Sequence, residues 1–279
     1  MRSNRPYKLA ICTQDYNEKT IEKMFNTMPI EVSPFVLKNI EHKRIHLFDT
    51  LFFVNPNLTK AQIKIFENCI SNGITALILL AGDSASHASA IPLLNDLGLR
   101  IQTTVTSQSL KIQYSPDFPT KGKSGLQDTL RADKNTTFAL FALDDHGPED
   151  KKVLYYHRKF FRKHPAAVEI NFGDGKIVIM NSVAISQDRA EIMADLMTHA
   201  RENKPDFSAT MVEDAVDKIP GIVNNAFDVY DQVPLDLVLK RAGIDDVLLS
   251  EMDIMERLEE FILAGQIQAR INGNVLTRS

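Results

Sequence analysis

The sequence has little cysteine and no long apolar run. Its two cysteines, Cys12 and Cys69, lie far apart, each within an apolar pattern. We therefore expect buried, reduced thiols suited to the cytosol rather than a disulfide framework. The longest apolar run, residues 74–81, falls well short of the ~20 residues that span a bilayer. The basic N-terminus lacks the apolar region of a signal peptide. These absences predict a cytoplasmic protein with no membrane partner.

Neither sign of charge dominates. The formal net charge is -4 and the isoelectric point is about 6.0. The totals therefore make no case for nucleic acid or an anionic membrane, although a local basic face could still exist. Internal repeats and low-complexity tracts are also absent, which excludes solenoids and arrays. With 279 residues, the chain is long enough for one large domain or two modest ones.

The first part of the chain, residues 1–204, alternates between strand and helix patterns. Short apolar runs predict strands at 7–13, 30–37, 46–54 and 74–81, and helical periodicity predicts helices at 19–28, 60–71, 91–97 and 186–202. Residues 101–105 predict a short strand, 113–134 an irregular surface excursion, and 137–143 a further strand. Paired strands are expected at 152–156 and 167–172, with a tight turn at 173–175 before strand 176–180. Such alternation is typical of an α/β domain with a doubly wound, mostly parallel sheet.

The last part of the chain has a different pattern. Residues 205–232 are acidic and weakly patterned, and we interpret them as a linker with some helix. Residues 233–279 predict a helix at 235–241, a second helix at 250–263, and a hairpin with an Asn272-Gly273 turn. Helix, turn, helix and hairpin form a pattern similar to a winged helix. The sequence thus predicts a small winged-helix-like C-terminal domain.

The loop Gly82-Asp83-Ser84-Ala85-Ser86 is the first candidate for chemistry, because it follows a predicted buried strand. It is close to the G-x-S-x-G turn of serine hydrolases, but Ser86 replaces the second glycine. His87, His157 and His199 could act as a base, yet none comes with a recognisable orienting carboxylate. The simpler interpretation is a polar loop that caps the next helix through Ser84 or Ser86. A third interpretation is a weak ligand site formed by Gly82, Asp83, Ser84 and Ser86.

Other motifs favour structural interpretations. The Gly122-Lys123-Ser124 segment lacks the upstream glycine and the leading strand of a phosphate loop. The acidic residues around His146, in 144–150, match no calcium loop and indicate a solvated turn. Residues 151–164 mix six Lys/Arg residues with four aromatic residues, which nucleic-acid binding could use. An exposed strand or helix with its apolar side in the core explains the same pattern. We predict no metal and no cofactor.

The C-terminal domain could contact either DNA or protein. Its last helix is rich in glutamate, whereas a helix pressed between phosphates should be basic. The acidic residues favour a protein partner. Four basic residues nevertheless keep a DNA-binding alternative open: Lys240, Arg241, Arg270 and Arg278.

The first domain resembles the GIFT-domain family, which occurs in gliding-associated proteins and in an intraflagellar transport complex B subunit. The resembling segments are LFFVNPNLTKAQIKIFENCISNGITALILLAGDSAS, IPLLNDLGLRI and GDGKIVIMNSVAISQDRAEIMADLM. The resemblance implies a fold like that of class I glutamine amidotransferases without their catalytic cysteine. The loop that would hold that cysteine is 82–86 in this chain. It also implies a scaffold or binding role, with a place in the cilium or flagellum.

We therefore expect a non-enzymatic scaffold or assembly subunit that binds other protein subunits, in an intraflagellar-transport-like complex. Two alternatives belong to other classes. One is a ligand-sensing regulator that binds DNA through the C-terminal domain. The other is a serine hydrolase that uses the loop from Gly82 to Ser86.

Overall fold

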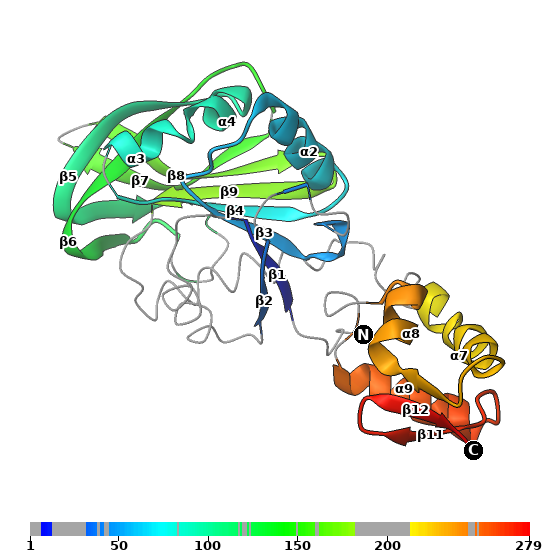
Figure 1. Ribbon diagram of the computed structural model, residues 1–279. Helices are drawn as coiled ribbons and strands as arrows, with labels where there is room; N and C mark the ends of the chain where they lie inside the picture. Colours follow the sequence, from blue (N-terminus) through cyan, green and yellow to red (C-terminus); the bar gives the residue numbers. More distant parts are fainter. Residues whose placement is uncertain are drawn as a thin grey trace. The chain divides into compact units, whose positions relative to one another are not determined.

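The computed structural model describes residues 7–12, 32–37, 40–41, 45–82, 84–116, 118, 122, 124–148, 150–159, 162–181, 213–244, 249 and 251–279, without the side chains of 84, 132–134, 159 and 251–252. The chain divides into two compact units, Met1–Lys204 and Pro205–Ser279. Figure 1 shows the elements of each unit. Within the described residues, no helix has both the length and the apolar character needed to cross a bilayer.

Five parallel strands form one half of the sheet of unit 1. In spatial order they are β2 (Val32–Val36), β1 (Tyr7–Ile11), β3 (Thr50–Val54), β4 (Thr75–Leu80) and β9 (Gly175–Asn181). A short 3-10 helix, η1 (Ile45–Leu47), precedes β3. All six residues of β4 are buried, as expected for a strand covered on both faces. The four strands predicted in the first 81 residues form within the predicted ranges.

The other half of the sheet is antiparallel, which corrects the prediction of a mostly parallel sheet. It consists of β8 (Arg162–Phe172), β7 (Lys151–Lys159), β5 (Leu99–Tyr114) and β6 (Gln127–Leu143). The nine-stranded sheet is mixed, with the order β2-β1-β3-β4-β9-β8-β7-β5-β6. Hairpin connections cause this change of direction, because strands joined by short turns pair antiparallel. The predicted turn at 173–175 joins β8 to β9 as expected.

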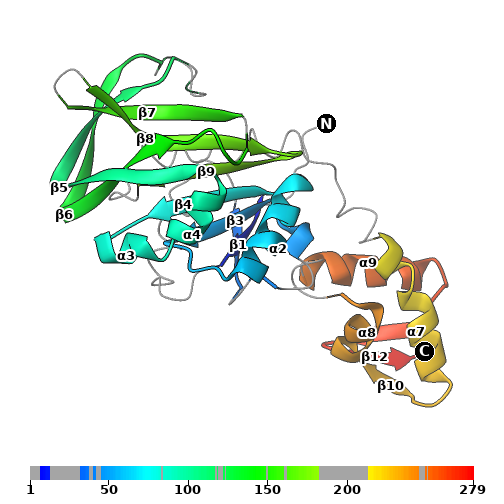
Figure 2. The ribbon, with the colours of Figure 1, turned by 90° about the horizontal axis from the view of Figure 1, so that it is seen from above.

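The β5–β6 hairpin is much longer than its sequence suggested. The short strand predicted at 101–105 lies within the 16-residue β5, and part of the predicted excursion 113–134 belongs to β6. Register shifts interrupt the pairing at Ile101/Thr103 and at Ser107/Ser109. Bulges of this kind bend and twist strands, and Figures 1 and 2 show the hairpin curving at one end of the sheet.

Helix α2 (Lys60–Ser71) packs on the face of the sheet that carries Phe53. Thr59 is the N-cap and forms a capping box with Gln62. The rings of Phe66 and Phe53 meet edge to face, with centroids 5.8 Å apart. Two shorter helices, α3 (Ser84–Ala88) and α4 (Ile91–Asp96), follow β4. The helices predicted at 19–28 and 186–202 lie outside the described residues, so the second helical layer of a doubly wound sheet stays a prediction.

The opposite face of the sheet carries a continuous apolar core. It joins the parallel strands to the curved hairpin and to β7 and β8. Its members include Leu9, Phe52, Leu77, Leu79, Leu110, Phe138, Leu154, Ala167 and Met180. The hairpin therefore belongs to the main core of unit 1, because its apolar side chains are buried together with those of β1, β3 and β4.

Unit 2 contains helices and a small sheet within its described residues. In chain order these are α7 (Ile219–Phe227), β10 (Gln232–Pro234), α8 (Leu235–Ala242), α9 (Glu251–Leu263), β11 (Ala269–Asn272) and β12 (Val275–Arg278). The strand order is β10-β12-β11, and β11 and β12 form the hairpin predicted around Asn272-Gly273. The range 205–232, interpreted as a linker with some helix, contains α7. That helix buries Ile219 and Val223.

Candidate functional site

The candidate site is the edge of unit 1 at which the parallel strands end, because open α/β sheets bind ligands outside the carboxyl ends of their strands. Asn55 follows β3 there, with a φ of 46°. Its Nδ2 donates to Ala81 O at 2.7 Å, and its Oδ1 accepts from Ala81 N at 2.9 Å. Ser89 Oγ donates to Asn55 O at 3.0 Å. The asparagine thus ties the end of β3 to the end of β4.

Gly82 opens the loop after β4, and its φ of +87° lies in the left-handed region that glycine tolerates. A Cβ at this position would lie 3.0 Å from Ser86 Oγ. Gly82 O accepts hydrogen bonds from Thr137 N at 3.1 Å and from Thr136 Oγ1 at 3.3 Å. Both threonines belong to β6, and Figure 1 shows β6 at the end of the sheet where α3 lies. The backbone oxygen of Gly82 is therefore hydrogen-bonded by the protein's own strand β6.

Asn181 ends β9 at the same edge and is only 1% exposed. Its Oδ1 accepts from Ala139 N at 2.7 Å, and its Nδ2 donates to Ala139 O at 2.9 Å. The same Nδ2 also donates to Ala166 O at 3.0 Å. Ala139 lies in β6 and Ala166 in β8. One side chain therefore completes the backbone pairing of both strands, and it fixes β6 to the end of β9.

Cys12 follows β1 at this edge, where a nucleophile could stand. Neither it nor Cys69 is part of a disulfide, and Cys69 is buried as the sequence predicted, whereas Cys12 is only partly buried. The backbone N of Cys12 donates to Phe52 O at 2.9 Å, and its Sγ–H donates weakly to Ala10 O at 3.7 Å. Burial, together with the nearby Cys69, raises the pKa of the Cys12 thiol to about 12. At neutral pH the group is a neutral thiol, whereas the thiolate is the reactive form. Cys12 is therefore suited to packing and not to nucleophilic attack.

The residues predicted for the Gly82 loop divide into three kinds. Gly82 lies at the edge as expected, whereas Asp83 lies outside the described residues. Ser84 is the first residue of α3, and Ser86 is exposed on that helix. His87, the next residue, is only 1% exposed. A base enclosed in the protein cannot exchange protons readily with a substrate at the surface, so this loop offers little support for the hydrolase alternative.

The other two candidate bases do not complete a hydrolase site. His157 lies on β7, and its Nδ1 donates to Lys111 O at 2.7 Å. It belongs to the antiparallel half of the sheet, away from the strand that precedes the loop. His199 lies outside the described residues. The structure thus brings together Gly82 and Ser86 but joins no predicted catalytic set among the residues it describes.

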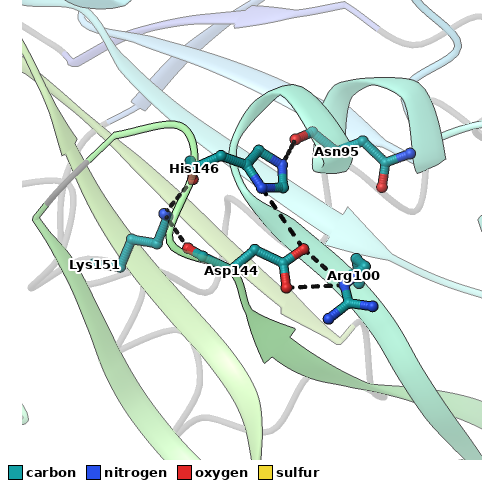
Figure 3. A network of polar contacts seen from close by, with 5 residues as sticks. All are labelled: Asn95, Arg100, Asp144, His146 and Lys151. Atoms are coloured by element: carbon teal, nitrogen blue, oxygen red, sulfur yellow. Dashed lines mark hydrogen bonds and ion pairs between the residues drawn. The ribbon is translucent and has the colours of Figure 1, made fainter.

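A second polar network lies where α4 leads into β5 (Figure 3). Arg100 Nε donates to Asp144 Oδ1 at 2.9 Å, and His146 Nε2 donates to Asn95 O at 3.0 Å. Lys151 Nζ donates to the backbone oxygens of Asp144 and His146, at 2.9 and 2.8 Å. The Arg100 guanidinium holds the pKa of the Asp144 carboxyl below its usual value. These groups fasten the β6–β7 turn to the start of β5.

The network accounts for much of the acidic segment 144–150. Residues 145–147 form exposed bends, in agreement with the interpretation as a solvated turn. No group of three or more His, Cys, Asp or Glu side chains that could hold a metal ion occurs among the residues that the structure describes. The carboxylate of Asp144 is engaged by Arg100 instead.

The Gly122-Ser124 segment lies in the connection between β5 and β6. Ser124 Oγ donates to Pro116 O at 2.7 Å, and the next element is the strand β6. A phosphate loop needs a helix whose N-terminal amides face the phosphates. This segment lacks that context, as its sequence indicated.

The basic residues of the DNA-binding alternative are spread over unit 2. Lys240 and Arg241 lie in the last turn of α8, Arg270 in β11 and Arg278 in β12. Arg278 Nη1 donates to Phe227 O at 3.0 Å, so this guanidinium has a structural partner.

Helix α9 presents negative charge. Its exposed acidic residues are Asp253, Glu256, Glu259 and Glu260. Arg257, the one basic residue of this helix, lies 2.8 Å from a carboxylate oxygen of Glu260. Repulsion from phosphates opposes docking of such a helix in a DNA groove. The charge distribution gives no support to a DNA-binding regulator.

Sequence reasoning missed Asn55, Asn181 and Thr136, which organise the edge. Each asparagine follows an apolar run directly, in LFFVN and in IVIMN. That position is a usable signal, since an amide side chain can continue the hydrogen bonding of a strand that has ended. Part of β6 was predicted at 137–143, but its contact with Asn181 could not be inferred, because the two segments lie far apart in the chain.

No protein-family model matches this sequence, and no curated protein matches it. Solved structures do resemble it in fold. A β-galactosidase from Bacillus circulans sp. alkalophilus matches with a TM-score of 0.52 and 12% identity, over 71% of this chain and 32% of that chain. The mmIFT52 N-terminal domain matches with a TM-score of 0.52 and 11% identity, over 70% of this chain and 96% of that domain. The carbohydrate deacetylase Agd3 gives a TM-score of 0.47 and 9% identity, over 78% of this chain and 40% of that chain.

These likenesses concern the fold alone, because the identities are too low to indicate more. The chain spans about a third of the β-galactosidase, so the likeness covers one part of that enzyme. It spans nearly all of the mmIFT52 N-terminal domain. The resemblance to the GIFT-domain family is thus supported at the level of the fold. The enzymes among these structures leave the chemistry to be decided by the site itself.

Proposed function

We propose that this protein is a non-enzymatic scaffold or assembly subunit that acts through protein–protein contacts. The contacts that β6 makes at the carboxyl edge of the sheet are the observation that supports this best. Gly82 O is occupied by two threonine donors of β6, and Asn181 is bound to Ala139 of the same strand. Other open α/β sheets bind ligands at this edge, whereas in this chain β6 contacts Gly82 and Asn181 there.

The side chains near the edge agree with a role without catalysis. A nucleophile needs a lowered pKa or an adjacent base. The pKa of the Cys12 thiol is raised to about 12, and His87 is buried beside the exposed Ser86. Neither the Cys12 thiol nor the Ser86 hydroxyl is thus activated as a nucleophile at neutral pH.

The nature of the complex follows from the family resemblance. We place the protein in an intraflagellar-transport-like complex, in the cytoplasm and the cilium or flagellum. Support comes from the match in fold to nearly the whole mmIFT52 N-terminal domain. The resemblance in sequence, over roughly residues 1–200, points the same way.

Unit 2 supplies the contact surface in this proposal. Its order of helix, strand, helix, helix and hairpin is that of a winged helix, and we assign it that fold. Four large apolar side chains are exposed there among the described residues, and the three most exposed are Val229 (72%), Tyr230 (61%) and Leu263 (87%), with Leu237 at 38%. Exposed apolar groups on the unit that carries the acidic α9 suit a protein surface better than a nucleic acid.

The test compares partner recovery by two variants of the tagged full chain, expressed at endogenous level and cross-linked before purification. The first variant combines Val229→Ser, Tyr230→Ser and Leu263→Ser. We expect recovery of specific partner proteins, identified by mass spectrometry, to fall about tenfold or more, as for the loss of central interface anchors.

The matched control places three serines on unit 1, at Val36, Ile91 and Leu126, which are 49%, 42% and 55% exposed. It should retain the partners. Recovery of the wild-type chain alone would overturn the scaffold function. Equal loss in both variants would overturn the assignment of the surface to unit 2.

A further inference from the structure

The β7–β8 hairpin ends in a two-stranded projection. The last residue of β7 that pairs with β5 is His157, opposite Ile112. On the other side, the pairing of β8 with β9 reaches only to Ala167. Residues 158–159 and 162–165 therefore lack a neighbouring strand in the ladder on either side, whereas Ala166 is buried and accepts a hydrogen bond from Asn181. An isolated pair of strands is marginally stable in water, so this projection contributes little to the stability of the sheet.

Its cross-strand pairs carry like charges. Arg158 lies opposite Lys163, and Lys159 lies opposite Arg162. His157 lies opposite His164 in the next pair toward the sheet. Like charges directly opposite each other destabilise a ladder. Successive basic pairs at the least supported part of the sheet have no explanation in folding stability.

Acidic side chains do not compensate these charges among the described residues. Arg158, Arg162 and Lys163 are exposed, and none of them forms an ion pair with a described carboxylate. The contacts near the tip are of other kinds. Lys163 Nζ lies 5.6 Å from the centroid of the Tyr156 ring, and His164 Nδ1 lies 3.2 Å from Gln102 Oε1. The tip is therefore a concentrated positive charge on a chain whose net charge is -4.

Both faces of the hairpin carry this charge. Directly opposed residues share a face, and successive residues of a strand alternate between faces. Arg158 and Lys163 thus occupy one face, while Arg162 lies on the other with the histidine pair. A strand or helix of a partner would touch only one face. Contact of the tip end-on with a flat anionic layer would use both.

We propose that the β7–β8 tip binds an anionic lipid surface, through Arg158, Arg162 and Lys163 and the phosphate and carboxylate groups of the lipids. Clustered Lys and Arg residues bind such surfaces in proportion to their number, until salt screens them. The expectation of no membrane partner rested on the lack of a spanning run, and attachment by surface charge needs none. This contact is additional to the protein contacts of unit 2, since it uses another part of the chain.

Among the residues described at the tip, no aromatic ring is placed to stack with the bases of a single-stranded nucleic acid. Such binding combines basic residues with aromatic rings on which bases stack. Of the aromatic residues described in this segment, Tyr155 is buried in the core against Tyr114. Tyr156 is half-buried and lies beside Lys163. Neither of these rings offers an open face for a base.

The experiment measures binding of the full chain to two kinds of vesicle by co-sedimentation. One kind is phosphatidylcholine alone, and the other is phosphatidylcholine mixed with phosphatidylserine. The wild type should bind only the mixed vesicles, and less as salt is raised. The variant with Arg158→Gln, Arg162→Gln and Lys163→Gln should lose affinity roughly 100-fold, from about fivefold for each charge.

Two further variants control for net charge and for folding. Lys60→Gln, Lys64→Gln and Lys152→Gln remove the same charge from exposed positions elsewhere in unit 1 and should change binding little. Arg158→Lys, Arg162→Lys and Lys163→Arg keep the charge at the tip and should keep binding. Loss in this second control would overturn the charge mechanism.

Three outcomes would refute the lipid proposal. They are equal binding of the wild type to both kinds of vesicle, an equal loss of binding in the Lys60, Lys64 and Lys152 control, or full binding by the variant with glutamines at the tip. Binding of single-stranded RNA at concentrations that leave the mixed vesicles free would also overturn it, in favour of a nucleic-acid surface. If the serine variant of unit 2 keeps its partners, that result counts against the proposed protein contacts. It does not affect the vesicle result, which tests a different part of the chain.

Discussion

Single amide side chains hold the edge of the sheet together. Asn55 and Asn181 each use both amide atoms to bind a backbone segment from another part of the chain. An amide side chain can do this because it carries both a donor and an acceptor, as a peptide group does. The two residues therefore act as extensions of β3 and β9 beyond the points at which those strands end.

Replacing Asn181 with alanine should destabilise unit 1. The change leaves the buried N–H and C=O of Ala139 and the C=O of Ala166 without their amide partner. Buried groups that lose partners are costly, and we expect a loss of about 3 kcal/mol in the free energy of unfolding. Urea unfolding followed by far-ultraviolet circular dichroism measures it, since the chain has no tryptophan.

The control for this variant is Asn72→Ala. Asn72 is exposed at the end of α2 and donates to Asn68 O of the same helix. Its replacement should cost less than about 1 kcal/mol. Similar losses at positions 72 and 181 would show that Asn181 does not bind β6 in solution.

Cys12 should resist alkylation until the pH is far above neutral. Its pKa is raised to about 12, so at pH 8 its reaction with iodoacetamide should be about a thousandfold slower than that of an ordinary thiol. Folding favours the neutral thiol. The resulting stabilisation is fully present below the ordinary thiol pKa and is lost as the pH rises from there toward 12.

Peptide mapping after timed alkylation gives the rate at Cys12 separately from Cys69. The same chain unfolded in urea is the control, because both thiols then react as ordinary cysteines. Rapid labelling of Cys12 in the folded protein at pH 8 would contradict the raised pKa and would reopen a nucleophilic role.

At the scale of elements, the connection from α4 to β5 passes close to the connection from β6 to β7, beside the polar network of Figure 3. Gly98, just before β5, has a φ of +65°, and a Cβ there would overlap the backbone oxygen of His146. Gly147 lies against Gly98 in the same way, because its Cβ would come within 2.9 Å of Gly98 N. The crossing therefore needs glycine on both segments, and it fixes the position at which the β5–β6 hairpin begins and ends.

Gly98→Ala should be much more harmful than Gly125→Ala. Both glycines have positive φ, but a Cβ at Gly125 would meet nothing within 4 Å. Strain in the left-handed region alone costs about 1–2 kcal/mol, and overlap with fixed backbone should add about 3 kcal/mol at Gly98. Thermal unfolding of the two variants measures the difference. Equal midpoints would mean that the two connections do not touch.

At the scale of the whole molecule, unit 1 combines two kinds of sheet. Its parallel half is the part expected of an α/β domain, and its antiparallel half curves over the same apolar core. This arrangement brings β6 against Gly82 and Asn181 at the carboxyl edge and leaves the β7–β8 tip without neighbouring strands in the ladder. Both features are thus consequences of one topology. The two proposals assign different surfaces to unit 1 and unit 2, so each can fail without the other.

Several features were decided by local sequence. Helix α2 matches its predicted range, because apolar periodicity and the capping by Thr59 are local. The buried strands β1, β3 and β4 and the hairpins after β8 and β11 also depend on local apolar runs and turn residues. The acidic character of α9, which opposes DNA binding, was readable in the same way.

Other features needed the tertiary structure. The length of β5 and β6 was hidden because polar residues such as Thr103 and Ser107 suit a half-exposed strand only when its partner is present. The occupation of Gly82 O by β6 depends on pairing between segments far apart in the chain. The positive charge of residues 151–164 was visible in the sequence. Its placement on the two opposed strands β7 and β8, beyond their pairing with β5 and β9, was not. Composition and periodicity therefore determined which segments form elements. Long-range pairing decided that β6 contacts the carboxyl edge at Gly82 and Asn181 and that the basic tip is exposed, because register and strand order depend on contacts distant in sequence.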